Sequence, residues 1–384
     1  MSDAERRRPR RAHLALRTSE ATSFGHGFIS GLMSALLGLA GLGLVLGLHV
    51  PAYVSFGELQ PIYASPYLRA AIHVTLVASF LLGTVSAMLR SNKTLALAGI
   101  GFTLLAALLG GSRAGAAGPA GGAASSLAVD FFVLNLLLYS AVFVPLERLF
   151  ALRGDQAVFR RHWVVDLSYF FCNSLLVEVL TVMTLTPALV LFDWARVASI
   201  AHLVASLPLP VQVLAMVLVA DLTQYWVHRT FHAVPVLWRF HAIHHSVEEM
   251  DWLAGSRLHL VDVIVTRGLT YVPIFVLGFS RQALVAYVFL VAAQATFIHA
   301  NVRWEFRPLR RLVATPAFHH WHHSSEQDAL DKNFAVHTPL WDLLFGTYYL
   351  PGHWPTRYGL AGRPDVPVGW VKQLLYPFRR RRTE

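Results

Sequence analysis

Long stretches of this chain contain almost no charged residues, and this feature limits the possible folds more than any other. A run of 18 or more apolar residues is long enough to cross a bilayer as a helix. Such stretches occur at residues 27–51, 68–89, 94–112 and 127–146. Charged residues make up 14% of the 384-residue chain, whereas a soluble domain carries roughly 25%. The sequence therefore predicts an integral membrane protein that spans the bilayer several times.

Further hydrophobic segments follow in the second half of the chain. The predicted segments lie near residues 27–50, 69–89, 94–112, 127–147, 164–192 and 208–227, with a final pair at 261–278 and 282–298. The final pair, joined by GFSRQ, fits a spanning hairpin or a re-entrant one. The first segment exceeds the apolar core of a signal peptide, about 7–15 residues, so we expect it to be retained. The predicted fold class is an all-α polytopic membrane bundle with a histidine-rich di-metal helical cap that faces the cytoplasm.

Positive charge is concentrated at the two termini and beside the apolar stretches. Arginines crowd residues 6–11 and 379–382, and the formal net charge is +10. Cytoplasmic loops are enriched in Lys and Arg, and anionic headgroups attract them. We therefore expect both termini in the cytoplasm and the protein in a bacterial cytoplasmic membrane. Nucleic-acid binding is not expected, because no aromatic-basic groove pattern accompanies the charge.

Composition also predicts the domain organisation. We expect a basic cytoplasmic tail at 1–24, a four-helix transmembrane region at 25–150, a histidine-box domain at 151–350 and a basic tail at 351–384. The stretch GGSRAGAAGPAGGAASS has the composition of a linker. GLGLVLG, residues 41–47, lies inside a predicted membrane helix, so its glycines indicate close helix packing and not a nucleotide site. The single cysteine, Cys172, excludes an internal disulfide.

Histidine is concentrated in three short boxes in the second half of the chain. Of 19 histidines, 11 lie between residues 228 and 323. The boxes are HRTFH with His228 and His232, HAIHH with His241, His244 and His245, and HHWHH with His319, His322 and His323. Positions i, i+3 and i+4 share one face of a helix. Each box is therefore expected to present two or three imidazoles together, and the three faces could converge on one site.

Imidazoles clustered in this way favour a metal site over separate core histidines. Buried neutral imidazoles would each need a hydrogen-bond partner, and protonated ones would repel one another. A pH-sensing cluster or a proton relay is the remaining interpretation. One zinc ion takes three or four protein ligands, so eight or nine imidazoles fit two metals better. Imidazole suits zinc, copper, iron and nickel, so the residue types leave the metal open.

The boxes, in this order and with their flanking residues, resemble the fatty acid hydroxylase/sterol desaturase superfamily of membrane histidine-box di-iron oxygenases. The resemblance covers about residues 210–350. Other matching positions are Asp221, Tyr225, Trp226, Trp238, Asp251, Arg257, His259, His299, Asn301 and the stretch WDLLFGT at 341–347. Two positions depart from the family's pattern: Leu260 stands where the family often has proline, and His320 where it usually lacks histidine.

The resemblance implies a lipid hydroxylase or desaturase that uses two iron ions (Fe²⁺), O₂ and two electrons from an external donor. That donor would be a ferredoxin-like or small haem protein. The implied catalytic and metal-binding residues are His228, His232, His241, His244, His245, His299, His319, His322 and His323, with His259 as a weaker candidate. The clustered histidines are consistent with this chemistry, because no side chain can oxidise an alkane and a redox metal is therefore needed.

Residues around the metals are predicted to orient the histidines. Metal-bound histidines usually donate their second N–H to a carboxylate or carbonyl. Asp221, seven residues before His228, lies two helical turns away on the same face and is the best candidate. Arg257 and Asn301 are further candidates for this outer layer. His320 points off the face that its neighbours share and is expected not to be a ligand.

Two other functions compete with the oxygenase. A membrane zinc hydrolase would need a general-base carboxylate inside a box, as in HExxH, and no box has one. A metal transporter would place histidines along its spans, whereas here they cluster in polar segments. The lipid, the choice between hydroxylation and desaturation, the oligomeric state and the role of the first four helices are left open by the sequence.

Overall fold

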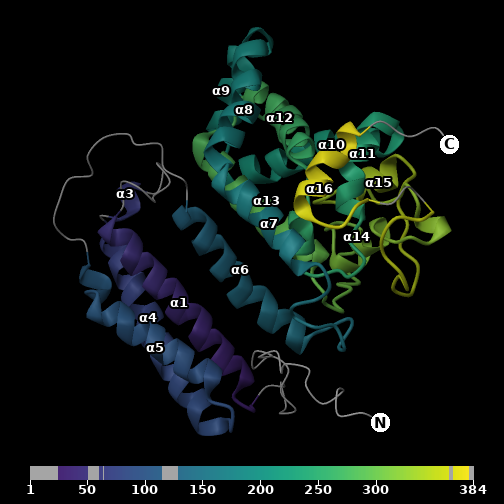
Figure 1. The fold of residues 1–384 in the computed structure, drawn as a ribbon. Coiled ribbons are helices and arrows are strands. Elements are labelled where there is room, and N and C mark those ends of the chain that lie inside the picture. The colour runs from purple at the N-terminus through teal and green to yellow at the C-terminus, as the bar shows by residue number, and fades with distance from the viewer. Residues whose placement is uncertain (1–24, 51–59, 64, 115–128, 363–365, 380–384) are drawn as a thin grey trace, which may run out of the picture. The chain divides into compact units, whose positions relative to one another are not determined.

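Helices make up all the regular secondary structure that the computed structural model describes (Figure 1). The described residues are 25–50, 60–63, 65–114, 129–362 and 366–379. Within them, isolated β-bridges join Ala151 to Val302 and Ser324 to Tyr358. The all-α prediction is confirmed. The predicted basic tail at 1–24 and most of the predicted glycine-rich linker lie outside the described residues.

The chain divides into two compact units, Met1–Leu149 and Phe150–Glu384. The first unit contains α1 (Phe28–His49), α3 (Gln60–Tyr63), α4 (Pro66–Leu89), α5 (Thr94–Leu108) and α6 (Val129–Leu149). Helix α1 packs against α4, α5 and α6.

Small and hydroxylated residues bring these helices close together. A Cβ atom at Gly99 would lie only 2.0 Å from Ser34 Oγ, so only glycine allows α1 and α5 this approach. Ser34 Oγ donates to the Ser79 carbonyl at 2.7 Å, and Ser79 Oγ donates to the Ser34 carbonyl at 2.8 Å. Gly41, in the GLGLVLG stretch, approaches Leu76 in the same way. Small residues and interhelical hydrogen bonds are the usual means of helix packing in a bilayer.

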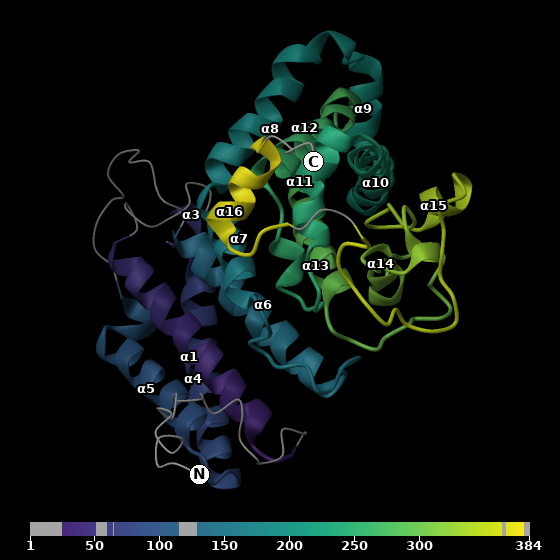
Figure 2. The same ribbon diagram turned by 45° about the vertical axis from the view of Figure 1, so that its right-hand side comes forward.

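The second unit carries the histidine boxes and is also helical (Figure 2). Its α-helices are α7 (Trp163–Leu175), α8 (Val177–Leu191), α9 (Ala198–Ser206), α10 (Leu209–Ala233), α11 (Pro235–His245), α12 (Leu260–Leu277), α13 (Arg281–His299), α14 (Pro316–His322), α15 (Leu340–Leu344) and α16 (Trp370–Leu375).

The predicted hydrophobic segment at 164–192 is not one helix. It breaks at Leu176 into α7 and α8, which have 13 and 15 residues. A helix needs about 20 residues to cross the hydrocarbon core, so neither half is long enough to span it alone. The apolar composition predicted the segment correctly, but it carried no signal for the break.

Six of the described helical segments are long and apolar enough to cross a membrane. They are Phe28–His49, Pro66–Leu89, Thr94–Arg113, Leu209–Ala233, Leu260–Leu277 and Arg281–His299. The prediction of an integral membrane protein is thereby confirmed. In the second unit, α10, α12 and α13 pack through an apolar cluster that includes Met216, Ile274 and Tyr287. The histidines lie where α10 and α13 end and α12 begins.

Candidate metal centre

Helix ends bring the histidine boxes together. His228 and His232 lie in the last two turns of α10, and His299 is the last residue of α13. Because Pro lacks an N–H and has a helical φ, it favours the first position of a helix. Prolines begin both short helices that carry the other boxes, α11 at Pro235 and α14 at Pro316.

Nine histidines meet at this end of the second unit, in two groups. The first group contains His228, His232, His241, His245 and His322, and the second contains His244, His299, His319 and His323. In each group, one ring nitrogen of every histidine lies within 4.8 Å of those of the others. These are the nine histidines that the sequence analysis singled out as ligands.

Adjacent histidines serve different groups. Consecutive residues of a helix point about 100° apart, so His244 and His245 diverge, as do His322 and His323. His244 lies against His323, with ring centroids 4.6 Å apart, and His245 lies against His322 at the same distance. Each consecutive pair therefore gives one imidazole to each group. The one site expected from the three boxes thus consists of two adjoining groups, of five and four histidines.

One short loop orients most of the five-histidine group. Residues 331–334 accept hydrogen bonds from the Nδ1 atoms of three of its histidines. The pairs are His232 with Asp331 Oδ1 at 3.0 Å, His322 with the Lys332 carbonyl at 2.7 Å, and His228 with the Phe334 carbonyl at 2.7 Å. Within the same group, His241 Nδ1 lies 2.7 Å from Asp262 Oδ2.

Asp221 holds this part of the chain and bonds no histidine ring. Its carboxylate accepts hydrogen bonds from the backbone N–H groups of Val336, His337 and Thr338 at 2.8–2.9 Å. Asp342 accepts from the backbone of Phe334 and Ala335 at 2.8 and 2.9 Å. The predicted direct contact between Asp221 and a histidine is therefore wrong. Asp221 acts one layer further out, by fixing the backbone beside the carbonyls that orient the rings.

Backbone carbonyls orient two of the histidines in the four-histidine group. His244 Nδ1 donates to the Arg257 carbonyl at 3.2 Å, and His299 Nδ1 donates to the Ala295 carbonyl at 2.6 Å. The Nε2 atoms face one another. His299 Nε2 lies 3.3 Å from His244 Nε2 and 3.0 Å from His319 Nε2. His319 Nε2 in turn lies 3.2 Å from His323 Nε2.

These hydrogen bonds fix the tautomers, and the tautomers fit a bound cation. A carbonyl oxygen only accepts, so the Nδ1 atoms of His228 and His322 carry the proton. In a neutral ring Nε2 then presents a lone pair. His228 Nε2 lies 2.9 Å from His241 Nε2, while the buried Nε2 of His322 has no hydrogen-bond partner among the described residues. Lone pairs gathered at one point are stabilised by a metal ion, and an all-imidazole set suits zinc, copper, iron or nickel.

Burial keeps the rings in the form that binds metal. Desolvation is the main cause that lowers the pKa well below the usual value, and the neighbouring imidazoles lower it further. This applies to His244, His245, His319, His322 and His323. A neutral imidazole is the ligand form, so these five histidines are held in the form that can bind a metal ion.

Arg257 belongs to a buried ion network. Its Nε donates to Asp166, which also accepts from Arg160 Nη2 at 2.7 Å. Arg160 in turn donates to Asp251 at 2.8 Å. All four side chains are buried, with two positive and two negative charges. The network supports the metal centre indirectly, because the carbonyl that orients His244 is that of Arg257.

Asn301 and His259 lie outside both groups. The side chain of Asn301 bonds the backbone N–H and carbonyl of Arg153, at 2.9 and 3.1 Å. His259 caps α12: its Nδ1 accepts from Val261 N at 3.1 Å, and its Nε2 lies 3.2 Å from the Leu374 carbonyl. Both ring nitrogens of His259 are therefore engaged away from the site.

His320 points away from both groups, as its place on the helix predicted. Its Nε2 lies 3.2 Å from the Ala300 carbonyl, so Nε2 carries the proton, and its Nδ1 accepts from the Tyr358 hydroxyl at 2.9 Å. Burial lowers the pKa of His320 to about 3. The neutral ring thus ties α14 to the segment around Tyr358, whose neighbour Gly359 donates to the His323 carbonyl at 3.3 Å.

Two carboxylates that contact histidine rings, Asp262 and Asp331, were not predicted from the sequence. Asp262 lies in the first turn of α12, and Asp331 lies in a loop where its φ is +56°. A carboxylate partner was expected for some histidine, but helical spacing within one box cannot identify an acid from another element. Asp331 lies 99 residues from its histidine along the chain.

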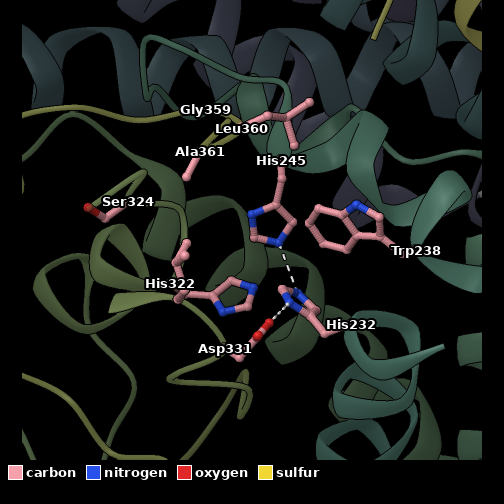
Figure 3. A pocket seen from close by; sticks show the side chains of 10 residues that line it. His232, Trp238, His245, His322, Ser324, Asp331, Gly359, Leu360 and Ala361 are labelled. Carbon is pink, nitrogen blue, oxygen red and sulfur yellow. Dashed lines mark hydrogen bonds and ion pairs between the residues drawn. The ribbon is translucent and has the colours of Figure 1, made fainter. Parts of the chain in front are cut away.

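A small cavity opens beside the five-histidine group. Its volume is about 20 Å³, which is room for about one water-sized molecule. His232, His245 and His322 point toward one another in it, and Trp238 lies beside His245 (Figure 3). Gly359, Leu360 and Ala361 form another wall. Residues 359–361 of the C-terminal part therefore border this small space beside the five-histidine group.

Known proteins match this chain over the region that contains the histidine boxes. Residues 213–347 match the family model described as fatty acid hydroxylase. An ornithine lipid hydroxylase of Rhizobium tropici is 31% identical over 175 residues, which is 45% of this chain and 52% of that protein. Alkylglycerol monooxygenases of Danio rerio and Homo sapiens are 28% and 30% identical, over 41% and 33% of this chain and 35% and 28% of their own lengths.

The chain spans about half the length of the first of these relatives and about a third of the other two. No solved structure matches it. The matched residues contain both histidine groups and the loop that orients them. Over residues 213–347, the chain is therefore similar to the fatty acid hydroxylase family.

Proposed function

We propose that this protein is a membrane di-iron oxygenase that hydroxylates an unactivated C–H bond of a lipid. The nine histidines carry the proposal, because they form groups of five and four in which one ring nitrogen of each histidine converges with the others, and eight of the nine are buried. Two iron ions, one in each group, would supply the redox chemistry that activates O₂. The overall reaction consumes a C–H bond, O₂, two electrons and two protons, and it yields an alcohol and water.

The residues of the chain would hold the irons and keep the rings in place. Asp262 and the loop at 331–334 orient four histidines of the five-histidine group, and the carbonyls of Ala295 and Arg257 orient two of the other group. Fixed rings limit the rearrangement needed at the metal when its oxidation state changes. The small cavity beside His232 and His322 has room for O₂ or water.

The names of the relatives favour hydroxylation of a lipid with a polar headgroup. They are called ornithine lipid hydroxylase and alkylglycerol monooxygenase, and no desaturase is among those compared above. The histidines lie at the ends of helices able to span a bilayer. A long apolar chain could therefore approach the site from the hydrocarbon region while its headgroup stays at the interface.

The remaining assignments belong to the same proposal. We place the histidine-box domain at 151–350 on the cytoplasmic side of a bacterial membrane, with both termini cytoplasmic. A ferredoxin-like or small haem protein would supply the electrons there. The helices of 25–150 would add membrane anchorage, and the basic tails at 1–24 and 351–384 would lie at the cytoplasmic surface.

The competing functions fit the geometry less well. A zinc hydrolase needs a carboxylate free to act as a base at the metal. In both groups every potential ligand is a histidine, and Asp262 and Asp331 contact the Nδ1 sides of the rings. A metal transporter needs ligands along a path through the bilayer, whereas these histidines gather at one end of the helices.

Iron content and the fate of oxygen test the proposal together. Protein purified from iron-replete cells should contain about two irons per chain, and lipid extracts should gain one oxygen atom from ¹⁸O₂ when a reductant is supplied. A catalytically silent protein with stoichiometric zinc and no redox response would contradict the proposal. Comparison of lipids from cells with and without the protein would identify the substrate.

Asp262→Asn is expected to weaken metal binding by about 10–100-fold, the usual effect of removing an outer partner of a ligand. The amide carries no charge to polarise His241 and no longer enforces its tautomer. Metal affinity is measured by competition with a chelator. Asp155→Asn, at an exposed carboxylate, is the matched control and should leave the affinity unchanged. Equal affinities in the two variants would show that Asp262 does not orient a ligand.

A further inference from the structure

The loop between α13 and α14 exposes a surface that the proposed function does not use. Residues 306–313 are all exposed, although both ends of the loop are fixed. Arg303 N donates to the Phe150 carbonyl and Ala314 N to the His337 carbonyl, each at 2.9 Å. Four large apolar side chains are 41–55% exposed in this stretch: Phe306, Leu309, Leu312 and Val313. Several exposed apolar side chains on one fixed loop mark a candidate interaction surface.

The same loop is strongly basic. Residues 303–313 contain one acidic residue, Glu305, and four basic ones: Arg303, Arg307, Arg310 and Arg311. The loop begins directly after α13, which is long and apolar enough to span a membrane. Four or more basic residues next to a membrane helix are typical of segments that bind anionic lipids.

Aromatic residues mark the level of the interface. Trp304 packs against Phe150 and Phe306, with ring centroids 5.0 and 5.6 Å apart, and against Phe297 of α13 at 6.1 Å. Tryptophan is enriched at the boundary between headgroups and hydrocarbon. The cluster therefore joins the end of a spanning helix to the basic loop at the depth where lipid phosphates lie.

A cavity of about 410 Å³ lies beside the loop. Arg307 and Arg310 line it together with Glu305, His353 and Trp354. Glu305 is already paired, because its carboxylate accepts from Arg307 Nε at 2.8 Å. Arginine matches the geometry of a phosphate group, and the volume lies within the range of small-molecule sites.

We propose that this cavity binds the phosphate of an anionic phospholipid, with Leu309 and Leu312 placed against its acyl chains. Exposed apolar residues between the arginines favour a lipid over a soluble phosphate ester, which would have no use for them. The position of the loop directly after a helix able to span a membrane favours a lipid over an acidic protein. The site needs neither metal nor turnover, so it stands apart from the proposed oxygenase activity.

Lipid retention by the full chain tests the site. The protein is reconstituted in nanodiscs of equal phosphatidylglycerol and phosphatidylcholine, extracted in mild detergent, and its bound lipids are counted by native mass spectrometry. The wild type should retain phosphatidylglycerol preferentially. The double variant Arg307→Gln/Arg310→Gln should lower that preference about 30-fold, given the usual contribution of about 1 kcal/mol for each basic residue near anionic lipid. Arg161→Gln/Lys372→Gln removes two exposed charges elsewhere and should not change it.

Either of two results in the lipid-retention experiment would overturn the proposal. One is an unchanged phosphatidylglycerol preference in the Arg307/Arg310 variant. The other is displacement of the lipid by glycerol 1-phosphate at equal concentration, which would assign the cavity to a soluble phosphate ester. A bimane label gives a second readout. On Leu312→Cys in a Cys172→Ala background it should be quenched by brominated lipids, and on exposed Gln327→Cys it should not. Equal quenching of both labels would also exclude the proposed placement.

Discussion

His322→Ala is expected to abolish lipid hydroxylation and to reduce the metal content from about two ions per chain to about one. His322 belongs to the five-histidine group, and its buried Nε2 has no other partner among the described residues. Since even outer partners of a ligand contribute about 10–100-fold, loss of a ligand should lower turnover by more than about 100-fold. Metal analysis and product formation are measured on the same preparation.

The control for His322→Ala is the same change at a histidine outside both groups. His202 is exposed in α9, so His202→Ala should keep both the metal content and the activity. Both variants should insert into membranes at the level of the wild type, because α14 is a short helix outside the candidate spans. Full activity of His322→Ala would refute its assignment as a ligand.

Asp166→Ala is expected to destabilise the second unit by about 3–5 kcal/mol, the usual effect of removing one partner from a buried ion pair. Asp166 is fully buried and accepts hydrogen bonds from both Arg160 and Arg257. Without it the buried network carries two positive charges and one negative charge. The melting temperature of the protein in detergent measures the loss.

An exposed ion pair provides the matched control for Asp166→Ala. Arg161 and Glu248 lie 3.9 Å apart with side chains 72% and 66% exposed. Such pairs contribute about 0–1 kcal/mol, so Glu248→Gln should melt close to the wild type. Equal melting temperatures for the two variants would mean that the buried network contributes little. Because the Arg257 carbonyl orients His244, Asp166→Ala should also weaken metal binding at the four-histidine group.

Helical spacing predicted much of the candidate site. The i, i+3 and i+4 positions of the three boxes, with His299 from the family resemblance, are the nine histidines that the structure brings together. Their role as iron ligands stays a prediction, since the structure shows their convergence and not a bound metal. Spacing failed where two elements had to be compared. It could not identify Asp262 and Asp331 as the carboxylates that contact histidine rings. It also predicted that Asp221 would contact a histidine, whereas Asp221 accepts hydrogen bonds from backbone N–H groups.

The sequence by itself determined the membrane class, the all-α fold and the identity of the clustered histidines. These follow from local properties: long apolar runs must form helices in a bilayer to satisfy their backbone hydrogen bonds, and the helical repeat places boxed histidines on one face. Tertiary structure alone decided how the nine rings divide into groups of five and four and which loop orients them. Those outcomes depend on how α10, α11, α13 and α14 meet, since neighbours such as His322 and His323 differ only in which helix each one faces.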